Sequence, residues 1–471
     1  MNQDKPHTSS KWIYALVILF VTAAVIIGAW RITADKPVAI QNPAEIYDSA
    51  VSKLNSKEQV YYRISGAKSF SIADSTITEE FVRNVVVQGL GTETPFISID
   101  ETLSIGDYDI ILFDTYYDQK EYLTIQGVSF FAPMTLDSFT ARQIPLLTID
   151  SSLYANISGE RTAKQSVITF QNAQAVEPWV SNTPTSLVSA YGTVYLDNAG
   201  NLTASEYTAE YTCERTTFHL RISVEILSDE VPEMITPDTS GFQEVSSITT
   251  PLQLEKACGY LLSAERISAD YTDKIACQAF GDERIQAVHL ETDNSNTFNA
   301  LMDTKVTASN SSKAGVVSTT TKAEVFQDNI YSIATNGEGP IINAEVTLET
   351  MKGHCETQLI GTIVLPQYIS TITHTDTDEV CYIAFNATEE FAQVLIDEAC
   401  NTLYQTPAVL NNMADTYQTN AISAYITLDR VTGFPISSGF NYLGTFTISS
   451  LPYTLSFTAE QNYTLPIPPH S

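Results

Sequence analysis

Basic residues are scarce in this sequence, which has 24 Lys and Arg against 55 Asp and Glu and a formal net charge of −31. Phosphate backbones are bound by clustered Lys and Arg, so this balance excludes a nucleic-acid partner. It also disfavours adsorption to anionic membrane surfaces. Hydrophobic residues make up 44% of the 471 residues. The chain is therefore globular, and it is long enough for two or three domains.

The motifs of common enzyme classes are also absent. The sequence has no H-E-x-x-H, no G-x-S-x-G and no Walker loop, and its six histidines are scattered. Neighbouring acids such as Asp114 and Asp118 could carry out acid–base chemistry. In so acidic a chain their proximity means little, and we interpret them as the wet face of a strand. We expect a protein that is not an enzyme and holds no cofactor.

Cysteine patterns are equally sparse. The six cysteines include no C-x-x-C, which argues against redox catalysis and zinc. Five of them, from Cys258 to Cys400, follow the middle of the chain and cannot all pair with one another, so disulfides and buried free thiols both stay open. The stretch from His374 to Glu379 alternates oxygen donors but lacks the central Gly and terminal Glu of a calcium loop. We favour a solvated hairpin tip there and expect no metal site.

One long apolar run stands near the start of the chain. Residues 12–30 carry no charge, and as a helix they would span roughly 28 Å, close to the thickness of a bilayer core. Trp12, Tyr14 and Trp30 lie near its ends, where aromatic rings favour the membrane interface. A lipoprotein would need a cysteine just after the run, but the first is Cys213. A cleaved signal peptide would need a shorter core and small residues, and a core helix is rarely apolar on every face.

We interpret residues 12–30 as an uncleaved transmembrane signal anchor. Residues 1–11 then form a cytoplasmic tail and residues 31–41 a stem. The protein is expected in the cell membrane as a single-pass protein with its C-terminal ectodomain outside the cytoplasm. Its attachment to the membrane would run through this N-terminal helix.

The ectodomain contains an internal repeat. Asn42-Pro43-Ala44-Glu45 is a capping-type helix start, and Thr250-Pro251-Leu252-Gln253 repeats it. Each start leads into apolar residues at a spacing of four: Ile46, Ala50 and Leu54, then Leu254, Cys258 and Leu262. Further matches follow in the same order, and the offset in residue number between the two copies grows slowly along the chain. They pair residues 117–122 with 326–331, 167–172 with 382–387, 188–191 with 422–425, and 218–224 with 453–459.

We therefore expect two related domains, at residues 42–228 and 250–465, joined by an acidic linker at 229–249 and followed by a tail at 466–471. The second domain carries an extra helix after Asn386, with Phe391, Leu395 and Ala399 on one face. Alternating residues predict strands, for example from Leu220 to Ile226 and from Ala344 to Glu349. Turns are expected at residues 197–200 and 430–433. The expected fold class is α+β: a transmembrane helix followed by two tandem curved antiparallel half-barrels covered by helices.

This order of elements resembles the LolA/LppX-type fold of bacterial lipoprotein carriers and lipid-binding lipoproteins. The leading capped helix, the strands at 117–122 and 326–331, and the hairpins beginning at Ala190-Tyr191 and Ala424-Tyr425 carry the resemblance. The family implies a curved half-barrel that encloses an apolar cavity under its helices. The same fold resembles RseB-like regulators of the bacterial cell envelope, which bind protein partners. The missing lipoprotein cysteine and the tandem copies depart from the family pattern.

Two functions follow from this resemblance. The first is a membrane-anchored extracytoplasmic binding protein that holds a lipid or other apolar ligand, with Tyr122, Phe170, Tyr331 and Phe385 as the equivalent cavity residues of the two copies. The alternative is a non-enzymatic interaction or envelope-sensing module with a protein partner and no small ligand. The 24 Tyr and 20 Phe are numerous enough to line a cavity, and they are also enough to fill an ordinary core.

Overall fold

The computed structural model describes the chain between Pro37 and Leu465. Within that range it leaves out residues 73–74, 90–91, 93–94, 144–150, 152–154, 172–185, 215, 228–231, 233–237, 247, 280, 296, 311–315, 378–379 and 405–415. The predicted cytoplasmic tail, the predicted anchor at 12–30 and the C-terminal tail at 466–471 lie outside the described residues. Among the residues that are described, no helix is both long enough and apolar enough to cross a membrane.

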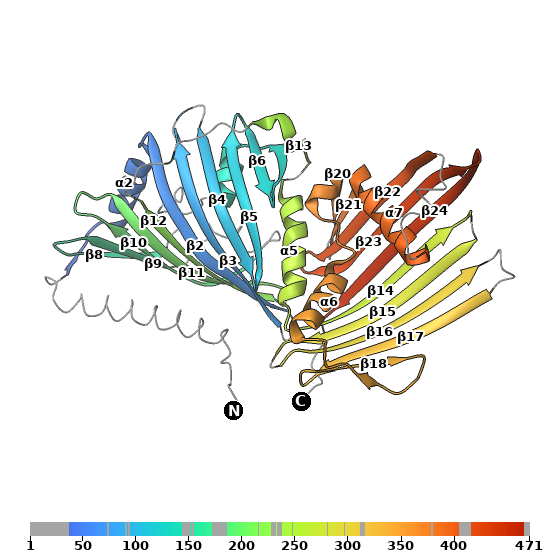
Figure 1. The fold of residues 1–471 in the computed structure, drawn as a ribbon. Coiled ribbons are helices and arrows are strands. Elements are labelled where there is room, and N and C mark those ends of the chain that lie inside the picture. The colour runs from blue at the N-terminus through green and yellow to red at the C-terminus, as the bar shows by residue number, and fades with distance from the viewer. Residues whose placement is uncertain are drawn as a thin grey trace.

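Two large sheets make up most of the structure (Figure 1). The first has 13 strands. In spatial order they are β1 (Val38–Ala39), β8 (Ala155–Arg161), β9 (Ser166–Gln171), β10 (Ser186–Leu196), β11 (Leu202–Cys213), β12 (Thr216–Ile226), β2 (Gln59–Ile72), β3 (Ser75–Gln88), β4 (Phe96–Ile105), β5 (Tyr108–Tyr117), β6 (Lys120–Ile125), β7 (Val128–Pro133) and β13 (Gln243–Glu244).

The second sheet has 11 strands. In spatial order they are β19 (Ile341–Ile342), β18 (Ile330–Thr335), β17 (Val316–Gln327), β16 (Asn299–Asn310), β15 (Asp282–Asp293), β14 (Arg266–Cys277), β24 (Leu451–Thr464), β23 (Pro435–Ile448), β22 (Thr416–Asp429), β21 (Val380–Ala387) and β20 (Ile369–Asp376). Every strand pair in this sheet is antiparallel, whereas the first sheet has one parallel pair, β13 with β7.

Both sheets are built in the same strand order. The first long strand of each lies in the middle, where β2 pairs with β3 and β12, and β14 pairs with β15 and β24. From there the chain meanders to one edge, crosses to the other edge and meanders back. A duplication would produce this shared order. The domain boundaries at 42–228 and 250–465 stay predictions, and the first sheet also takes in β1 and β13 from the expected stem and linker.

The helices are short and few beside the strands. They are α2 (Pro43–Asn55), α3 (Leu136–Gln143), α5 (Thr249–Ser263), α6 (Leu348–Ile360) and α7 (Glu389–Tyr404), with 3-10 turns η3 (Thr239–Gly241) and η5 (Pro366–Tyr368). Helix α2 begins with Pro at its first position, as predicted, and buries Tyr47, Ala50, Val51 and Leu54 along one stripe. Helix α7 confirms the predicted extra helix and buries Leu395 and Ala399.

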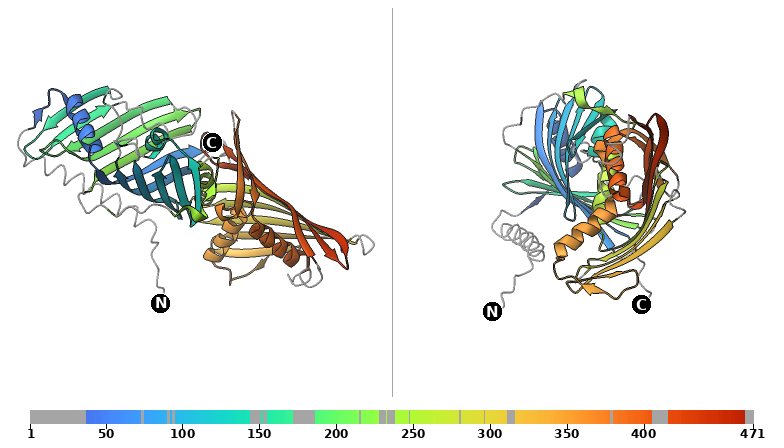
Figure 2. Two further views of the ribbon diagram at one scale, coloured as in Figure 1. Left: turned by 90° about the horizontal axis from the view of Figure 1, so that it is seen from above. Right: turned by 45° about the vertical axis from the view of Figure 1, so that its right-hand side comes forward.

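Helix α5 lies between the two sheets (Figure 2). It packs on β4 and β5 of the first sheet, on β23 of the second and on α6. Leu254, Gly259, Tyr260 and Leu261 are buried on different faces of the helix, as expected for a helix enclosed on all sides. Burying each leucine contributes roughly 1.5–3 kcal/mol. The apolar cores of the two sheets join into one cluster around this helix.

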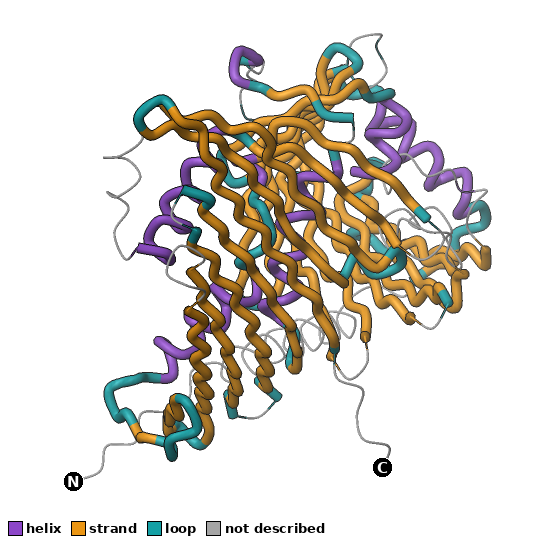
Figure 3. The backbone as a smooth tube through the Cα atoms, turned by 90° about the vertical axis from the view of Figure 1, so that its right-hand side faces the viewer, coloured by secondary structure: helices purple, strands orange, loops and turns teal. Residues whose placement is uncertain are grey.

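Both sheets are curved (Figure 3). At three places a glycine lies opposite an aromatic residue of the neighbouring strand. Phe81 lies opposite Gly66, Phe170 opposite Gly192, and Tyr425 opposite Gly439. A Cβ on these glycines would come within 2.8 Å, 2.0 Å and 2.9 Å of the partner ring. Each ring therefore covers the backbone of the neighbouring strand, an arrangement that accompanies sheet curvature.

The expected fold class is corrected by these observations. Of the described residues, 61% lie in strands and 19% in helices, so the expected α+β class is replaced by a predominantly β protein of two large sheets. The strand predicted from Ala344 to Glu349 is also wrong, because α6 begins at Leu348 after a turn. Thr347 caps this helix through its side chain, which accepts a hydrogen bond from the Thr350 amide. That capping preference outweighs the short alternating pattern.

Candidate functional site

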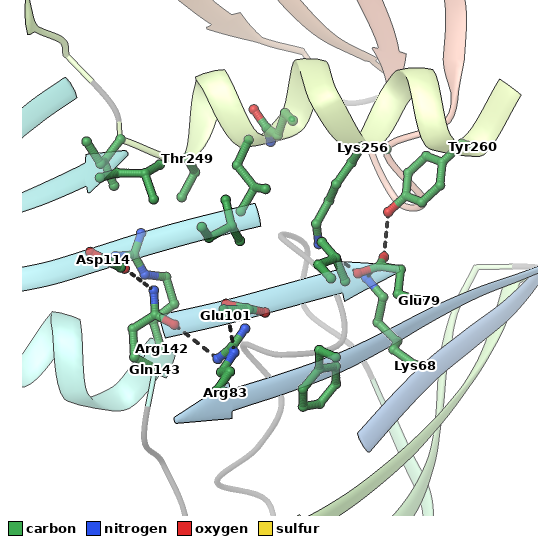
Figure 4. A pocket seen from close by; sticks show the side chains of 18 of the residues that line it. Lys68, Glu79, Arg83, Glu101, Asp114, Arg142, Gln143, Thr249, Lys256 and Tyr260 are labelled. Atoms are coloured by element: carbon green, nitrogen blue, oxygen red, sulfur yellow. Dashed lines mark hydrogen bonds and ion pairs between the residues drawn. The ribbon is translucent and has the colours of Figure 1, made fainter. Parts of the chain in front are cut away.

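A cavity of about 190 Å³ lies between the inner face of the first sheet and helix α5 (Figure 4). Strands β2 to β6 supply its floor, and α3 and the turn between β22 and β23 complete its wall. The site therefore draws on both sheets. Its apolar lining comes from Phe81, Leu103, Leu112, Leu123, Ile248 and Leu252.

Four carboxyl groups point inward from adjacent strands of this floor. Glu79 (β3), Glu101 (β4), Asp114 (β5) and Glu121 (β6) are each at most 5% exposed. They lie on the face of each strand that elsewhere carries core residues. Asp114, for example, lies on the same buried face of β5 as Leu112. Buried carboxylates are costly unless cations or hydrogen bonds compensate them. The cavity supplies those compensating groups from the same strands and from both helices.

Lysines gather at one end of the cavity. The ammonium groups of Lys68 and Lys256 lie 2.6 and 2.7 Å from the two oxygens of Glu79, and Tyr260 donates its hydroxyl to the same carboxylate. Burial opposes ionisation of Glu79, but the two lysines outweigh it and hold its pKa far below the usual range. Burial, together with the neighbouring Lys256, lowers the pKa of Lys68. Two cations share one anion here, which leaves an excess of positive charge.

The middle of the cavity is neutral. Arg83 and Glu101 are directly paired across β3 and β4, with Nε 2.9 Å from Oε2. Arg83 also donates from Nη1 to the side-chain oxygen Oε1 of Gln143 at 3.0 Å. The Gln143 amide in turn donates to Asp114 Oδ2 at 2.7 Å. This glutamine links the central ion pair to the far end of the cavity.

Two carboxyl groups face one cation at the other end. Arg142 donates to Glu121, and Asp114 lies beside this pair. Burial raises the pKa of Asp114 well above its usual range, the Glu121 charge adds to the effect, and the charge of Arg142 opposes it. Asp114 Oδ1 and Glu121 Oε2 have no donor among the described residues. Two neighbouring buried carboxyl groups disfavour ionisation of both, so this pair favours a state with one shared proton.

Helix α5 is seated closely against the first sheet beside this cavity. Tyr108 donates its hydroxyl to the buried Glu255 at 2.6 Å. Burial raises the pKa of Glu255, and the hydrogen bond from Tyr108 opposes that shift. A Cβ on Gly259 would lie 2.9 Å from Ile105 Cδ1. The absence of a side chain at Gly259 therefore lets the helix approach the sheet.

Replacing Gly259 with leucine is expected to lower the free energy of unfolding by about 2 kcal/mol, because overpacking forces the helix away from Ile105 and Tyr108. Chemical denaturation followed by circular dichroism measures this loss. The matched control is G353L in α6, where an added Cβ meets nothing within 4 Å. Equal stability of the two variants would show that the close approach of α5 does not matter.

The four predicted cavity residues do not line this cavity. Tyr122 lies on β6 next to Glu121 and packs against Phe131 and Phe242, with ring centroids 6.1 and 5.5 Å apart. Phe170 packs against Tyr207 in the core at the far side of the first sheet. Both side chains have protein partners at these positions. Their predicted role in a ligand cavity stays untested.

The equivalent residues of the second sheet are also packed in the core. Tyr331 donates its hydroxyl to Glu324 at 2.6 Å. Phe385 is buried on β21 within the same continuous cluster. The structure thus brings none of the four predicted residues together around a common space. The buried charges around α5 form the candidate site instead.

The interpretation of Asp114 as a wet-face residue is wrong. Its side chain is 4% exposed, whereas Asp118 lies in the exposed turn after β5. Asp114 shares its face of β5 with Ile110, Leu112 and Tyr116, but the sequence alone does not mark that face as the buried one, because Ile111 and Phe113 make the other face apolar as well. Arg142 and Lys256 carry no local signal either, since each reaches the cavity from a different helix.

Metal and thiol chemistry has few candidates in the described part of the chain. No group of three His, Cys, Asp or Glu side chains there is arranged to hold a metal ion. His374, from the stretch weighed as a calcium loop, has Nε2 3.0 Å from Cys381 Sγ. The described cysteines Cys213, Cys258, Cys277, Cys355 and Cys381 are all buried.

Comparisons with known proteins give only distant matches. No family model matches the sequence, and no curated protein does. LprF from Mycobacterium bovis, a lipoprotein with a LolA-like fold, is 8% identical with a TM-score of 0.26, over 42% of this chain and 98% of LprF. A putative AttH from Nitrosomonas europaea is 8% identical with a TM-score of 0.14, over 87% of this chain and 93% of that one. OpdK from Pseudomonas aeruginosa, crystallised with vanillate, is 6% identical with a TM-score of 0.11, over 86% of this chain and 98% of OpdK.

At these TM-scores the matches carry no argument about the fold or the function of this chain, and none of them tests the tandem arrangement.

Proposed function

We propose that this chain is a binding protein that takes up a small molecule with both charged and apolar parts in the cavity between the first sheet and α5. The cavity itself carries the proposal. It combines four cations and four carboxyl groups with a lining of leucines, isoleucine and phenylalanine. Ordinary ligand sites likewise join an apolar lining to a few converging polar groups.

The size of the cavity limits the ligand. Typical small-molecule pockets measure roughly 300–1,000 Å³, so about 190 Å³ accepts a small molecule or the polar end of a larger one. A whole lipid enclosed in an apolar half-barrel does not fit this space. The lipid or apolar ligand expected from the sequence is therefore refined to an amphipathic one, whose charged end enters the cavity.

Binding without catalysis accounts best for the charged groups. Every cation around the cavity is engaged with a carboxylate, and the carboxylates of Glu79 and Glu101 are held in ion pairs. The described residues that line the cavity include no serine or cysteine that could act as a nucleophile. The arrangement is suited to recognising charge rather than to breaking a bond.

Replacing Leu252 with tryptophan is expected to weaken binding by more than about tenfold, because the indole fills the cavity from the first turn of α5. Native mass spectrometry measures the fraction of protein that carries a bound ligand. Purified protein is first incubated with small-molecule and lipid extracts of the source cells. The wild type should retain an adduct that L252W lacks.

The matched control is L262W. Leu262 is half-buried on the same helix, as Leu252 is, and it does not line the cavity. The control should keep the adduct. An adduct that survives in L252W, or a wild-type protein that takes up no small molecule from either extract, would overturn the proposed function.

A further inference from the structure

The charges around the cavity are divided unevenly along its length (Figure 4). Lys68 and Lys256 share the single carboxylate of Glu79 at one end. Asp114 and Glu121 share the single cation of Arg142 at the other. With all groups ionised, one end has an excess of one positive charge and the other an excess of one negative charge. The pair of Arg83 and Glu101 between them is balanced.

Unused hydrogen-bonding capacity matches this division. Each lysine ammonium group has three N–H donors, and the contact of each with Glu79 needs only one of them. At the opposite end, Asp114 Oδ1 and Glu121 Oε2 accept no hydrogen bond from the described residues, and both side chains are more than nine-tenths buried. One end therefore offers donors and the other offers acceptors.

We propose that the ligand is a zwitterion, with an anionic group at Lys68 and Lys256 and an ammonium group at Asp114 and Glu121. This inference rests on the proposed function and names the chemical class of the ligand. The ammonium group takes the place of the proton that the two carboxyl groups share, and that proton leaves to solvent. The anionic group meets the remaining donors of the two lysines.

The groups around Asp114 set the conditions for this exchange. Glu121 on β6 and Glu101 on β4 favour its protonated form, and Arg142 on α3 opposes them. Gln143 donates to it, and the first turn of α5 at Thr249 lies over the same end of the cavity. Binding that releases a proton becomes tighter as the pH rises. We expect an increase of about tenfold per pH unit over the range in which Asp114 of the empty protein is protonated.

The two ends of the cavity lie far apart. Asp114 is displaced from Glu79 by six residues along the paired strands, or about 20 Å, so the two charges of the ligand must be well separated.

Isothermal titration calorimetry with 12-aminododecanoic acid as the probe tests the proposal. Titrations in buffers of different ionisation enthalpy should show about one proton released per molecule bound over the pH range in which Asp114 of the empty protein is protonated. Dodecylamine, which lacks the anion, and dodecanoic acid, which lacks the cation, should each bind at least about tenfold more weakly. Equal binding of dodecanoic acid, or binding of the probe without proton release, would overturn the proposal.

The variant D114N tests the role of the acid pair, Asp114 and Glu121, independently of the other cavity residues. It should bind 12-aminododecanoic acid about tenfold more weakly and release no proton, because an asparagine side chain has no acidic proton to give up. The control is D109N, on the same strand but exposed, which should behave as the wild type. Proton release that persists in D114N would contradict the assignment.

An amphipathic anion that binds in place of any zwitterion would overturn this inference and leave the proposed function standing.

Discussion

Replacing Glu79 with glutamine is expected to lower the free energy of unfolding by about 3–5 kcal/mol. The Glu79 carboxylate compensates Lys68 and Lys256, and it accepts the hydroxyl of Tyr260. Glutamine keeps the shape and removes the charge, so two ammonium groups stay in a partly buried space without an anion. Urea denaturation followed by circular dichroism measures the difference.

The control for this variant is E80Q, on the adjacent and exposed residue of β3, which should change stability by less than about 0.5 kcal/mol. In the double variant E79Q/K256M, one of the stranded cations is removed as well. The free energy of unfolding lost in the double variant should be smaller than the sum of the losses in E79Q and in K256M, because the two residues are in contact. A loss below about 1 kcal/mol for E79Q would show that the three groups are not coupled in the folded protein.

The pH dependence of the Glu79 contribution follows from the direction of its shift. The folded-state pKa of Glu79 is held far below the usual value, so the unfolded chain binds the proton more readily. The stabilisation is fully present above the unfolded value of about 4.3 and is lost as the pH falls toward the folded value. The stability difference between the wild type and E79Q should therefore be constant between about pH 6 and pH 8 and shrink in acid.

Replacing Gly192 with alanine is expected to cost about 3 kcal/mol. The new Cβ would lie 2.0 Å from Phe170 Cζ, so the ring of Phe170 must leave its place over the neighbouring strand. Displacing a buried phenylalanine ring forfeits much of its packing, and full truncation of such a side chain costs about 3–5 kcal/mol. Thermal unfolding by calorimetry measures the loss.

A double variant tests whether the Phe170 ring causes the loss of stability in G192A. In the background F170A the ring is gone, so G192A should then cost less than about 1 kcal/mol. G339A serves as the control, since an added Cβ there meets nothing within 4 Å. A wild-type stability for G192A would mean that Phe170 moves freely. It would return Phe170 to the role of cavity residue that the sequence predicted.

Local patterns predicted those parts of the fold that local chemistry determines. Helix α2 follows from Pro43 and the spacing of Ala50 and Leu54, and the helical pattern from Phe391 onward marks α7. The turn at Arg430 to Gly433 follows from its residue types. These signals lie within one or two turns of chain, where propensity and capping dominate.

The charged cavity could not be predicted in the same way. Strand β5 has apolar residues on both faces, with Leu112 inward and Ile111 and Phe113 outward, so its alternation does not show which face is buried. In a chain with 55 acids, one more aspartate carries no signal. The partners of Asp114 arrive from a separate strand and helix, and only the folded sheet brings them together.

The sequence alone does not distinguish the two roles that the aromatic residues could have. Phe170 occupies a position that looks equally suited to a cavity wall and to a core, because both are apolar. The decisive fact is the glycine directly opposite on β10, which requires a ring to cover it. Strand register supplies this fact, and register depends on pairings between distant segments.

A crystal structure of the full chain grown with 12-aminododecanoic acid tests the central claim most directly. We expect density between the first sheet and α5, with the carboxylate of the probe at hydrogen-bond distance from Lys256 and its ammonium group at Asp114. An empty cavity beside Leu252, with the probe bound elsewhere on either sheet, would contradict the assignment of this space as the binding site.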